Sequence, residues 1–285
     1  MIERVARFGT ARKLVGITCE PRNDAVASGP VFLLMNAGIL HRVGPHRINV
    51  DLSRRLAAAG FRSFRFDLSG QGDSAVRDEN PAQESSDMAD LLDAMDLLGT
   101  KWNTNQFVII GLCSGAFLAH RAGVLDDRII GAVFLDGYGY VTSGHRLRAP
   151  LKLAANPRRI SNFARRIVRE ITGAEGNDER TTVIEEDSDL PVFDEPFPPQ
   201  EQTTHELQHM LDQGKHLLFI YSGGVPEYFN HRDQFREMYG DLASRGDVDL
   251  EFYEEADHLY SWSRDRDELI GRVIGWATSR FAIGD

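Results

Sequence analysis

The pentapeptide at residues 111–115, Gly-Leu-Cys-Ser-Gly, places a thiol at the centre of a motif that can perform nucleophilic chemistry. An apolar run precedes it and a helix-like stretch follows it, which is the strand–turn–helix context of a nucleophile elbow. Such a turn holds its central residue at strained backbone angles, so small residues are needed two positions before and two positions after it. Glycines occupy both positions around Cys113, whereas a frame centred on Ser114 would place a leucine at one of them. The pattern predicts Cys113 as a nucleophile, and the alternative is a small core cysteine in a Gly-rich turn.

A carboxylate and a histidine follow two later apolar runs and could complete a catalytic triad with this thiol. Glu227 comes shortly after residues 217–221, and His258 comes shortly after residues 248–253. Because the carboxyl ends of parallel strands meet at one edge of a sheet, we expect both side chains to lie near Cys113. His258 would take the proton of the thiol, and Glu227 would orient the imidazole ring and stabilise its charged form.

A second carboxylate competes for the position of the acid. Asp136 directly follows the apolar run at residues 129–135, so it would reach the same edge of the sheet. Asp233 is a weaker third candidate, because it falls inside the helix expected after Glu227. The sequence favours Glu227 and leaves Asp136 open as the alternative acid.

The elements that must position these residues alternate between strands and helices along the chain. Strands are expected at residues 2–8, 13–20, 31–35, 61–68, 106–110, 129–135, 217–221 and 248–253. Helices are expected at residues 47–59, 84–98, 116–125, 231–244 and 265–281. Strands that alternate with helices indicate an α/β fold with a doubly wound, mostly parallel sheet, and the first two strands form a hairpin-like pair.

Residues 141–204 interrupt this alternation, because they contain no convincing strand. The Asn-Pro pair at residues 156–157 predicts a helix start, and apolar residues then recur at helical spacing as far as Ile171. We therefore expect residues 141–204 to form a cap insertion over the carboxyl edge of the sheet. The core would then consist of residues 1–140 and 205–285.

Composition and charge restrict the class of protein. The chain has 285 residues, which is enough for one large α/β domain, and its net charge of -11 argues against nucleic acid and anionic membrane surfaces as partners. It has two cysteines and no apolar stretch long enough to span a bilayer, so a cytoplasmic enzyme with a free thiol is expected. The sequence contains no metal-ligand cluster and no dinucleotide or P-loop fingerprint, so we expect no metal and no cofactor.

The chain resembles an α/β-hydrolase along its whole length apart from the insertion. The order Cys113, Glu227, His258 matches the order of triads in that superfamily. Residues 67–74, Asp-Leu-Ser-Gly-Gln-Gly-Asp-Ser, are similar to its D-x-x-G-x-G-x-S turn. The Gly-x-Cys-x-Gly elbow resembles those of dienelactone hydrolases, polyhydroxyalkanoate synthases and some thioesterases. Residues 111–116 are also similar to hydrolases associated with exopolysaccharide and exosortase systems.

The resemblance implies an oxyanion hole and supports the alternative acid. The backbone N–H of Ser114 would bind the developing oxyanion together with the N–H of Gly38 or of Ile39. The family commonly carries His-Gly in this loop, whereas this chain has Asn-Ala at residues 36–37, a departure that leaves the second donor open. Some family members take their acid from the strand that precedes Asp136 here.

A thiol nucleophile favours thioester substrates. Attack of a thiolate on a thioester exchanges one thioester for another, whereas attack on an ester makes a higher-energy acyl group and expels a poorer leaving group. We therefore expect a Cys-dependent acyl-transfer enzyme, a thioesterase or ester hydrolase that acts through an acyl-thioenzyme. One alternative is an acyltransferase that uses an amine or alcohol acceptor. The other is a catalytically silent binding protein of the same fold.

The expected cap carries a local excess of positive charge. Eight Lys or Arg residues and no acidic residue occur over residues 146–169. Four of these basic residues lie in the expected helix of the cap, namely Arg158, Arg159, Arg165 and Arg166. Such charges could dock an acyl carrier protein or the phosphates of a coenzyme A thioester. The alternative is a solvated helix face that the acidic stretch at residues 185–195 neutralises.

Overall fold

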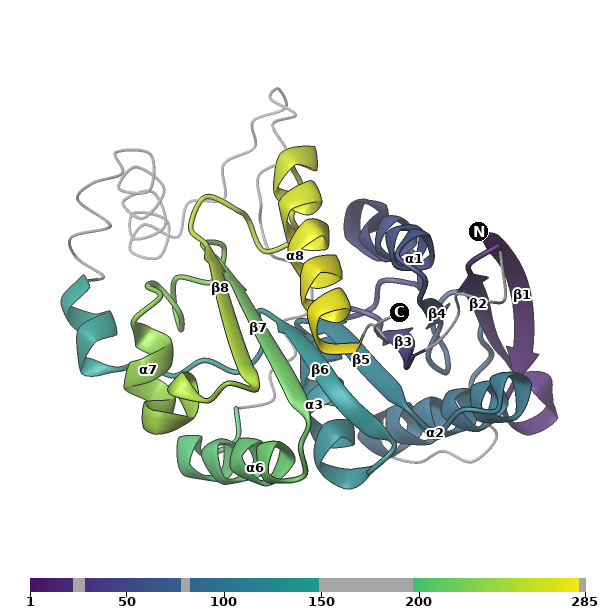
Figure 1. Cartoon of the computed structure of the whole chain (residues 1–285), viewed down its shortest axis with the longest axis horizontal. Coiled ribbons are helices and arrows are strands. Elements are labelled where there is room, and N and C mark those ends of the chain that lie inside the picture. The colour runs from purple at the N-terminus through teal and green to yellow at the C-terminus, as the bar shows by residue number, and fades with distance from the viewer. Residues whose placement is uncertain (23–28, 78–82, 149–196, 282–285) are drawn as a thin grey trace, which may run out of the picture.

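The structure is a computed structural model that describes residues 1–22, 29–77, 83–148 and 197–281. Within these residues an eight-stranded sheet crosses the molecule in the order β1-β2-β4-β3-β5-β6-β7-β8 (Figure 1). The strands are β1 (Ile2–Phe8), β2 (Leu14–Glu20), β3 (Val31–Leu34), β4 (Arg62–Phe66), β5 (Phe107–Leu112), β6 (Ile129–Leu135), β7 (His216–Ser222) and β8 (Val248–Tyr253). β2 pairs antiparallel with both β1 and β4, and the strands from β4 to β8 pair in parallel. The expected mostly parallel α/β sheet is confirmed.

Helices cover both faces of this sheet (Figure 1). They are α1 (Ile48–Ala58), α2 (Gln83–Trp102), α3 (Ser114–Leu125), α6 (Gln200–Asp212), α7 (Gln234–Tyr239) and α8 (Ser263–Phe281), with short 3-10 turns η1 (Thr10–Arg12), η3 (Pro45–Arg47) and η4 (Gly240–Ser244). Alternate residues of a strand point to opposite faces, so Val31 and Leu33 pack with α2, α3 and α6, whereas Phe32 and Leu34 pack with α1 and α8. Two apolar cores therefore hold the sheet between two helical layers.

A buried lysine anchors the helix that begins at the nucleophile elbow. The Nζ of Lys215, just before β7, donates hydrogen bonds to the carbonyl oxygens of Gly123 and Asp126 at 2.6 and 3.0 Å. Carbonyl groups in the last turn of a helix lack partners within the helix, so a cation at that end stabilises them. The far end of α3 is thereby held against the sheet.

The expected strands and helices are confirmed, with differences of a few residues at their ends. The helix expected at 231–244 is shorter, because Gly240 adopts a positive φ of 55° and α7 gives way there to η4. The sequence did not indicate α6. This helix begins with the polar run at residues 200–204, and its buried apolar side chains are few.

The expected cap lies largely outside the described residues. Residues 149–196 are not among those that the structure describes, so the predicted roles of Arg158, Arg159, Arg165 and Arg166 lie outside it. From the expected insertion the structure describes a helical stretch at residues 143–148 and the start of α6. Arg148 belongs to the basic cluster, by which we mean the eight Lys and Arg residues at 146–169. It forms an ion pair with Glu237 of α7 at 2.9 Å. The division into core and cap stays a prediction.

Candidate active site

Cys113 occupies a strained turn between β5 and α3. Its φ of 55° and ψ of -122° are unfavourable for a residue with a side chain, and such strain persists where the surroundings enforce it. A Cβ on Gly111 would lie 2.0 Å from the carbonyl oxygen of Gly115, and a Cβ on Gly115 would lie 2.4 Å from that of Asn36. The expected need for small residues on both sides of Cys113 is confirmed, because the backbone approaches too closely for any side chain.

His258, in the loop after β8, contacts a carboxylate from the loop after β6. Its Nδ1 lies 2.8 Å from Oδ2 of Asp136. Asp136 is 1% exposed and receives two further hydrogen bonds from Ser222, from the backbone N–H at 2.6 Å and from the hydroxyl at 2.7 Å. Three donors therefore surround the Asp136 carboxylate, and its orientation toward the imidazole ring is fixed.

The structure brings Asp136 to His258, and not Glu227, which the sequence favoured. The side chain of Glu227 is exposed on the loop after β7. The two glycines before it lie directly against the loop that carries His258. A Cβ on Gly223 would lie 1.9 Å from the carbonyl oxygen of Glu254, and a Cβ on Gly224 would lie 2.1 Å from the backbone nitrogen of His258. The Gly-rich turn thus lets the histidine loop approach the sheet, and the carboxylate comes from one strand earlier.

The surroundings of His258 favour its charged form. Burial acts to lower the pKa of His258, but hydrogen bonds to Asp136 and Cys113 raise it, and the resulting pKa is about 10. The other cysteine has a different environment, because Cys19 is fully buried and its burial raises the pKa of its thiol to about 11. Of the two cysteine side chains, that of Cys113 is therefore partly exposed to solvent, whereas that of Cys19 is buried.

The loop after β3 lies against the first turn of α3. The backbone N–H of Gly38 donates a 2.8 Å hydrogen bond to the hydroxyl of Ser114. The side chain of Asn36 spans the loop, because its Nδ2 donates to the carbonyl oxygen of Leu40 at 2.7 Å and its Oδ1 accepts from the N–H of Leu68 at 3.2 Å. The Asn-Ala departure therefore does not loosen this loop, since Asn36 braces it from within.

The other oxyanion candidate, Ile39, lies at the tip of the same loop with a side chain that is 61% exposed. Next to this loop is the turn at residues 67–74. Asp67 is buried there, accepts hydrogen bonds from the N–H groups of Arg42 and Asp73 at 2.6 and 3.0 Å, and pairs with the Arg42 guanidinium. This turn supports the position of the loop and does not contribute a group to the Cys113–His258 pair.

Half-buried aromatic side chains form a surface beside the elbow. Phe117, one helical turn after Cys113, stacks on Tyr138 with ring centroids 4.6 Å apart, and Phe197 packs edge-on against both rings. Tyr228 extends this aromatic surface and donates a 3.2 Å hydrogen bond to the backbone oxygen of Asp136.

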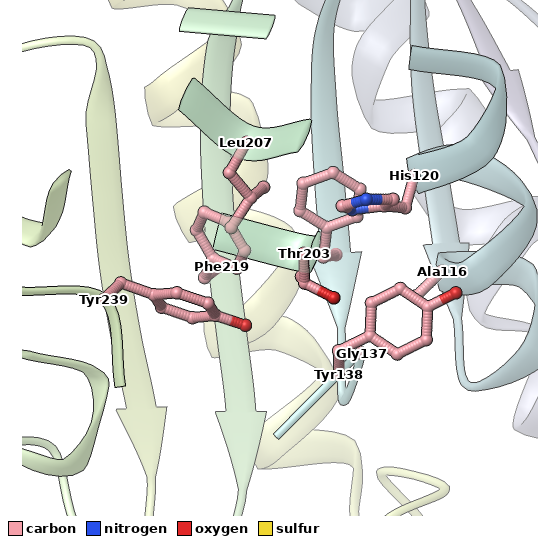
Figure 2. A pocket seen from close by; sticks show the side chains of 9 residues that line it. Ala116, His120, Gly137, Tyr138, Thr203, Leu207, Phe219 and Tyr239 are labelled. Carbon is pink, nitrogen blue, oxygen red and sulfur yellow. The ribbon is translucent and has the colours of Figure 1, made fainter. Parts of the chain in front are cut away.

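Behind Tyr138 lies a small internal cavity, which Figure 2 shows with His120, Ala116 and Tyr138 on one side and Phe219 and Tyr239 on the other. Its volume is about 10 Å³, which is room for about one water molecule. This cavity is too small for an acyl chain.

Two kinds of feature are absent from the described part of the chain. The histidine, cysteine and acidic side chains there form no group of three or more that could hold a metal ion. The helices there include none with the length and apolar character needed to cross a membrane.

Comparisons with known proteins agree with the fold. The model of the "Alpha/beta hydrolase family" matches residues 40–272, and no curated protein matches the chain. Among solved structures, the Pyrococcus furiosus esterase Pf2001 is similar with a TM-score of 0.62 and 15% identity, over 98% of this chain and 90% of the esterase. The α/β-hydrolase GrgF from Penicillium sp. sh18 has a TM-score of 0.61 and 15% identity, over 99% and 100% of the two chains. The proline iminopeptidase of Mycobacterium smegmatis has a TM-score of 0.57 and 12% identity, over 98% of each chain. The chain belongs to the alpha/beta hydrolase family.

Proposed function

We propose that this chain is a Cys-dependent acyl-transfer enzyme, a thioesterase or ester hydrolase that acts through an acyl-thioenzyme on Cys113. The observation that carries the proposal is the run of contacts from Asp136 through His258 to Cys113. Covalent acyl transfer needs a nucleophile, a base that contacts the nucleophile, and an acid that orients the base through a hydrogen bond. Membership of a hydrolase family agrees with this assignment.

In the first half of the reaction the thiolate of Cys113 attacks the substrate carbonyl carbon. A bond forms between Sγ and that carbon, and the carbonyl oxygen becomes an oxyanion, which the N–H groups at the start of α3 stabilise. As the intermediate collapses, the leaving thiol or alcohol departs with a proton from His258. The acyl group then remains on Cys113 as a thioester.

In the second half His258, now neutral, takes a proton from a water molecule that attacks the acyl-enzyme. The C–S bond breaks, the carboxylic acid leaves, and the proton returns the catalytic pair to its charged state. Asp136 keeps the imidazole ring in one orientation and stabilises its positive charge throughout both halves. The aromatic surface of Phe117, Tyr138 and Phe197 offers contacts to an apolar acyl group.

Mass spectrometry of the intact protein tests this function directly. The wild-type protein and the Cys113→Ala and Cys19→Ala variants are each mixed with a panel of acyl thioesters and esters. We expect an acyl adduct on the wild type and on Cys19→Ala, and none on Cys113→Ala. Conversion of the adduct to free acid identifies a hydrolase, and conversion to an amide or ester with an added amine or alcohol identifies an acyltransferase. Absence of any adduct or turnover across the panel would support the silent binding protein instead.

A further inference from the structure

We propose that the hydroxyl group of Ser114 is itself a hydrogen-bond donor of the oxyanion hole, an inference that rests on the proposed acyl transfer at Cys113. The backbone N–H of Ser114 is the first expected donor, and Gly38 is a candidate for the second. The Ser114 Oγ accepts the N–H of Gly38 at 2.8 Å. This oxygen therefore lies between the two positions from which an oxyanion would be bound.

The hydrogen bond between Gly38 and Ser114 removes one backbone donor from the hole. An N–H group that points at Ser114 Oγ is not free to point at a substrate oxygen. A serine hydroxyl can accept two hydrogen bonds and donate one. The hydrogen bond from Gly38 occupies one acceptor position of the Ser114 hydroxyl. Among the residues that the structure describes, it is the one hydrogen bond that the Ser114 side chain makes. The hydroxyl hydrogen is left to donate.

The loop cannot easily withdraw from Ser114 to release the N–H of Gly38. Asn36 ties this loop to the carbonyl oxygen of Leu40 and to the N–H of Leu68. On the other side, Gly115 approaches the backbone of Asn36 so closely that a Cβ would collide with its carbonyl oxygen at 2.4 Å. The loop is braced on two sides, so the contact with Ser114 persists while substrate binds.

A hydroxyl in this position is well suited to bind developing negative charge. Its oxygen already accepts an N–H, and hydrogen bonds in a chain polarise one another, so its own O–H becomes a stronger donor. Ser114 is half-buried, so its hydroxyl group is not sealed in the core. The N–H of Gly38 would then polarise the hydroxyl group of Ser114, and that hydroxyl would donate its hydrogen bond to the oxyanion. No proton is transferred in this arrangement.

Three measurements on Ser114→Ala and Ser114→Thr test the inference. The first is steady-state hydrolysis of a thioester that acylates the wild type. The second is inhibition by an acyl trifluoromethyl ketone, which forms a tetrahedral adduct with the thiol and an oxyanion. The third is alkylation of Cys113 by iodoacetamide, a reaction that produces no oxyanion.

For Ser114→Ala we expect kcat and affinity for the ketone to fall together by about 10²-fold, the usual effect of one lost oxyanion donor, with KM unchanged. Alkylation should proceed at the wild-type rate, and Ser114→Thr should recover a large part of kcat. Wild-type or faster turnover in Ser114→Ala overturns the inference, because the hydroxyl would then only occupy the N–H of Gly38. Loss of alkylation together with turnover also overturns it, because the hydroxyl would then hold the elbow itself. A wild-type protein that is never acylated refutes the proposed function, whereas an active wild type with an unaffected Ser114→Ala refutes this inference alone.

Discussion

Asp136 and His258 are 122 positions apart in the chain, yet Oδ2 of the first lies 2.8 Å from Nδ1 of the second. The two residues follow β6 and β8, and β7 runs between these strands. Ser222, at the end of β7, donates two hydrogen bonds to Asp136 and so fills the space between them. The histidine loop therefore reaches across one strand to meet a carboxylate that the intervening strand has already oriented.

This relationship predicts that Asp136 and Glu227 respond differently to loss of charge. Asp136→Asn should lower kcat/KM for a thioester by roughly 10²- to 10⁴-fold, because the imidazole ring loses its orienting carboxylate. Glu227→Gln should change it little, since that side chain is exposed. Steady-state kinetics of the two variants checks this, and thermal unfolding of both confirms that each is folded. A large loss in Glu227→Gln with normal activity in Asp136→Asn would return the acid to the loop after β7.

The two cysteines should react with iodoacetamide at very different rates. Cys113 lies beside His258, whereas Cys19 is buried in β2 with a raised pKa of about 11. We expect one equivalent of label at neutral pH, all of it on Cys113, and no labelling of folded Cys113→Ala. Peptide mass mapping after labelling gives the position. Slow labelling of Cys113 at the rate of an unfolded control peptide would remove the case for an activated thiol.

The pKa of His258, about 10 in the folded protein against an ordinary value of 6.5, links proton binding to stability. Between these two values the folded state binds more protons than the unfolded state, so the stabilising contribution is complete below about pH 6.5 and is lost as the pH rises through about 10. The difference in Tm between the wild type and His258→Gln should therefore shrink over this pH window.

Titration of the imidazole by NMR measures the same quantity directly. The midpoint of His258 should lie near pH 10 in the wild type and should fall in Asp136→Asn, which removes one of the hydrogen bonds that raise the pKa. Cys113→Ala should lower it as well, for the same reason. A midpoint near the ordinary value of 6.5 in all three proteins would show that Asp136 and Cys113 do not stabilise the protonated form of His258.

The basic cluster of the expected cap gives a prediction that depends on the sequence alone. If its charges dock a phosphorylated or acidic carrier, neutralising Arg158, Arg159, Arg165 and Arg166 should raise KM for coenzyme A or carrier thioesters with little change in kcat. The KM of the wild type should also rise with salt, because exposed charges are screened over about 8 Å at physiological ionic strength. A short neutral thioester is the control and should show neither effect. Equal kinetics for all of these substrates at low and high salt would favour the solvated helix face.

The sheet and the elbow could be predicted because their signals are local. Apolar runs bounded by turns gave the strands, and the spacing of glycines around Cys113 gave the strained turn that the structure confirms. His258 was identified in the same way, since it follows the last strand. The acid could not be chosen by the same rule, because Asp136 and Glu227 both follow strand ends. Only three-dimensional packing distinguishes them. Because Gly223 and Gly224 have no side chains, the loop that carries His258 can pack closely against them, and Glu227 remains exposed.

The role of the Asn-Ala pair was also beyond the reach of sequence patterns. As a replacement for His-Gly it left the second oxyanion donor open between Gly38 and Ile39. The structure shows that the buried side chain of Asn36 bonds to two backbone groups, at Leu40 and Leu68. These partners lie 4 and 32 positions away, and only the fold brings the second of them within reach. Likewise, the hydrogen bond between Gly38 and Ser114 spans 76 positions and leaves no periodic signal.

The placement of Cys19 in β2 has a consequence for oxidative damage. Three steps in the sheet separate β2 from β5, which leads to Cys113, so the two strands are roughly 14 Å apart at neighbouring-strand spacing. That separation alone puts the two thiols well beyond the reach of a disulfide. The chain has no other cysteine. A sulfenic acid formed on Cys113 could not be trapped by a second thiol of the same molecule, and without an external reductant it would proceed to the irreversible sulfinic and sulfonic acids.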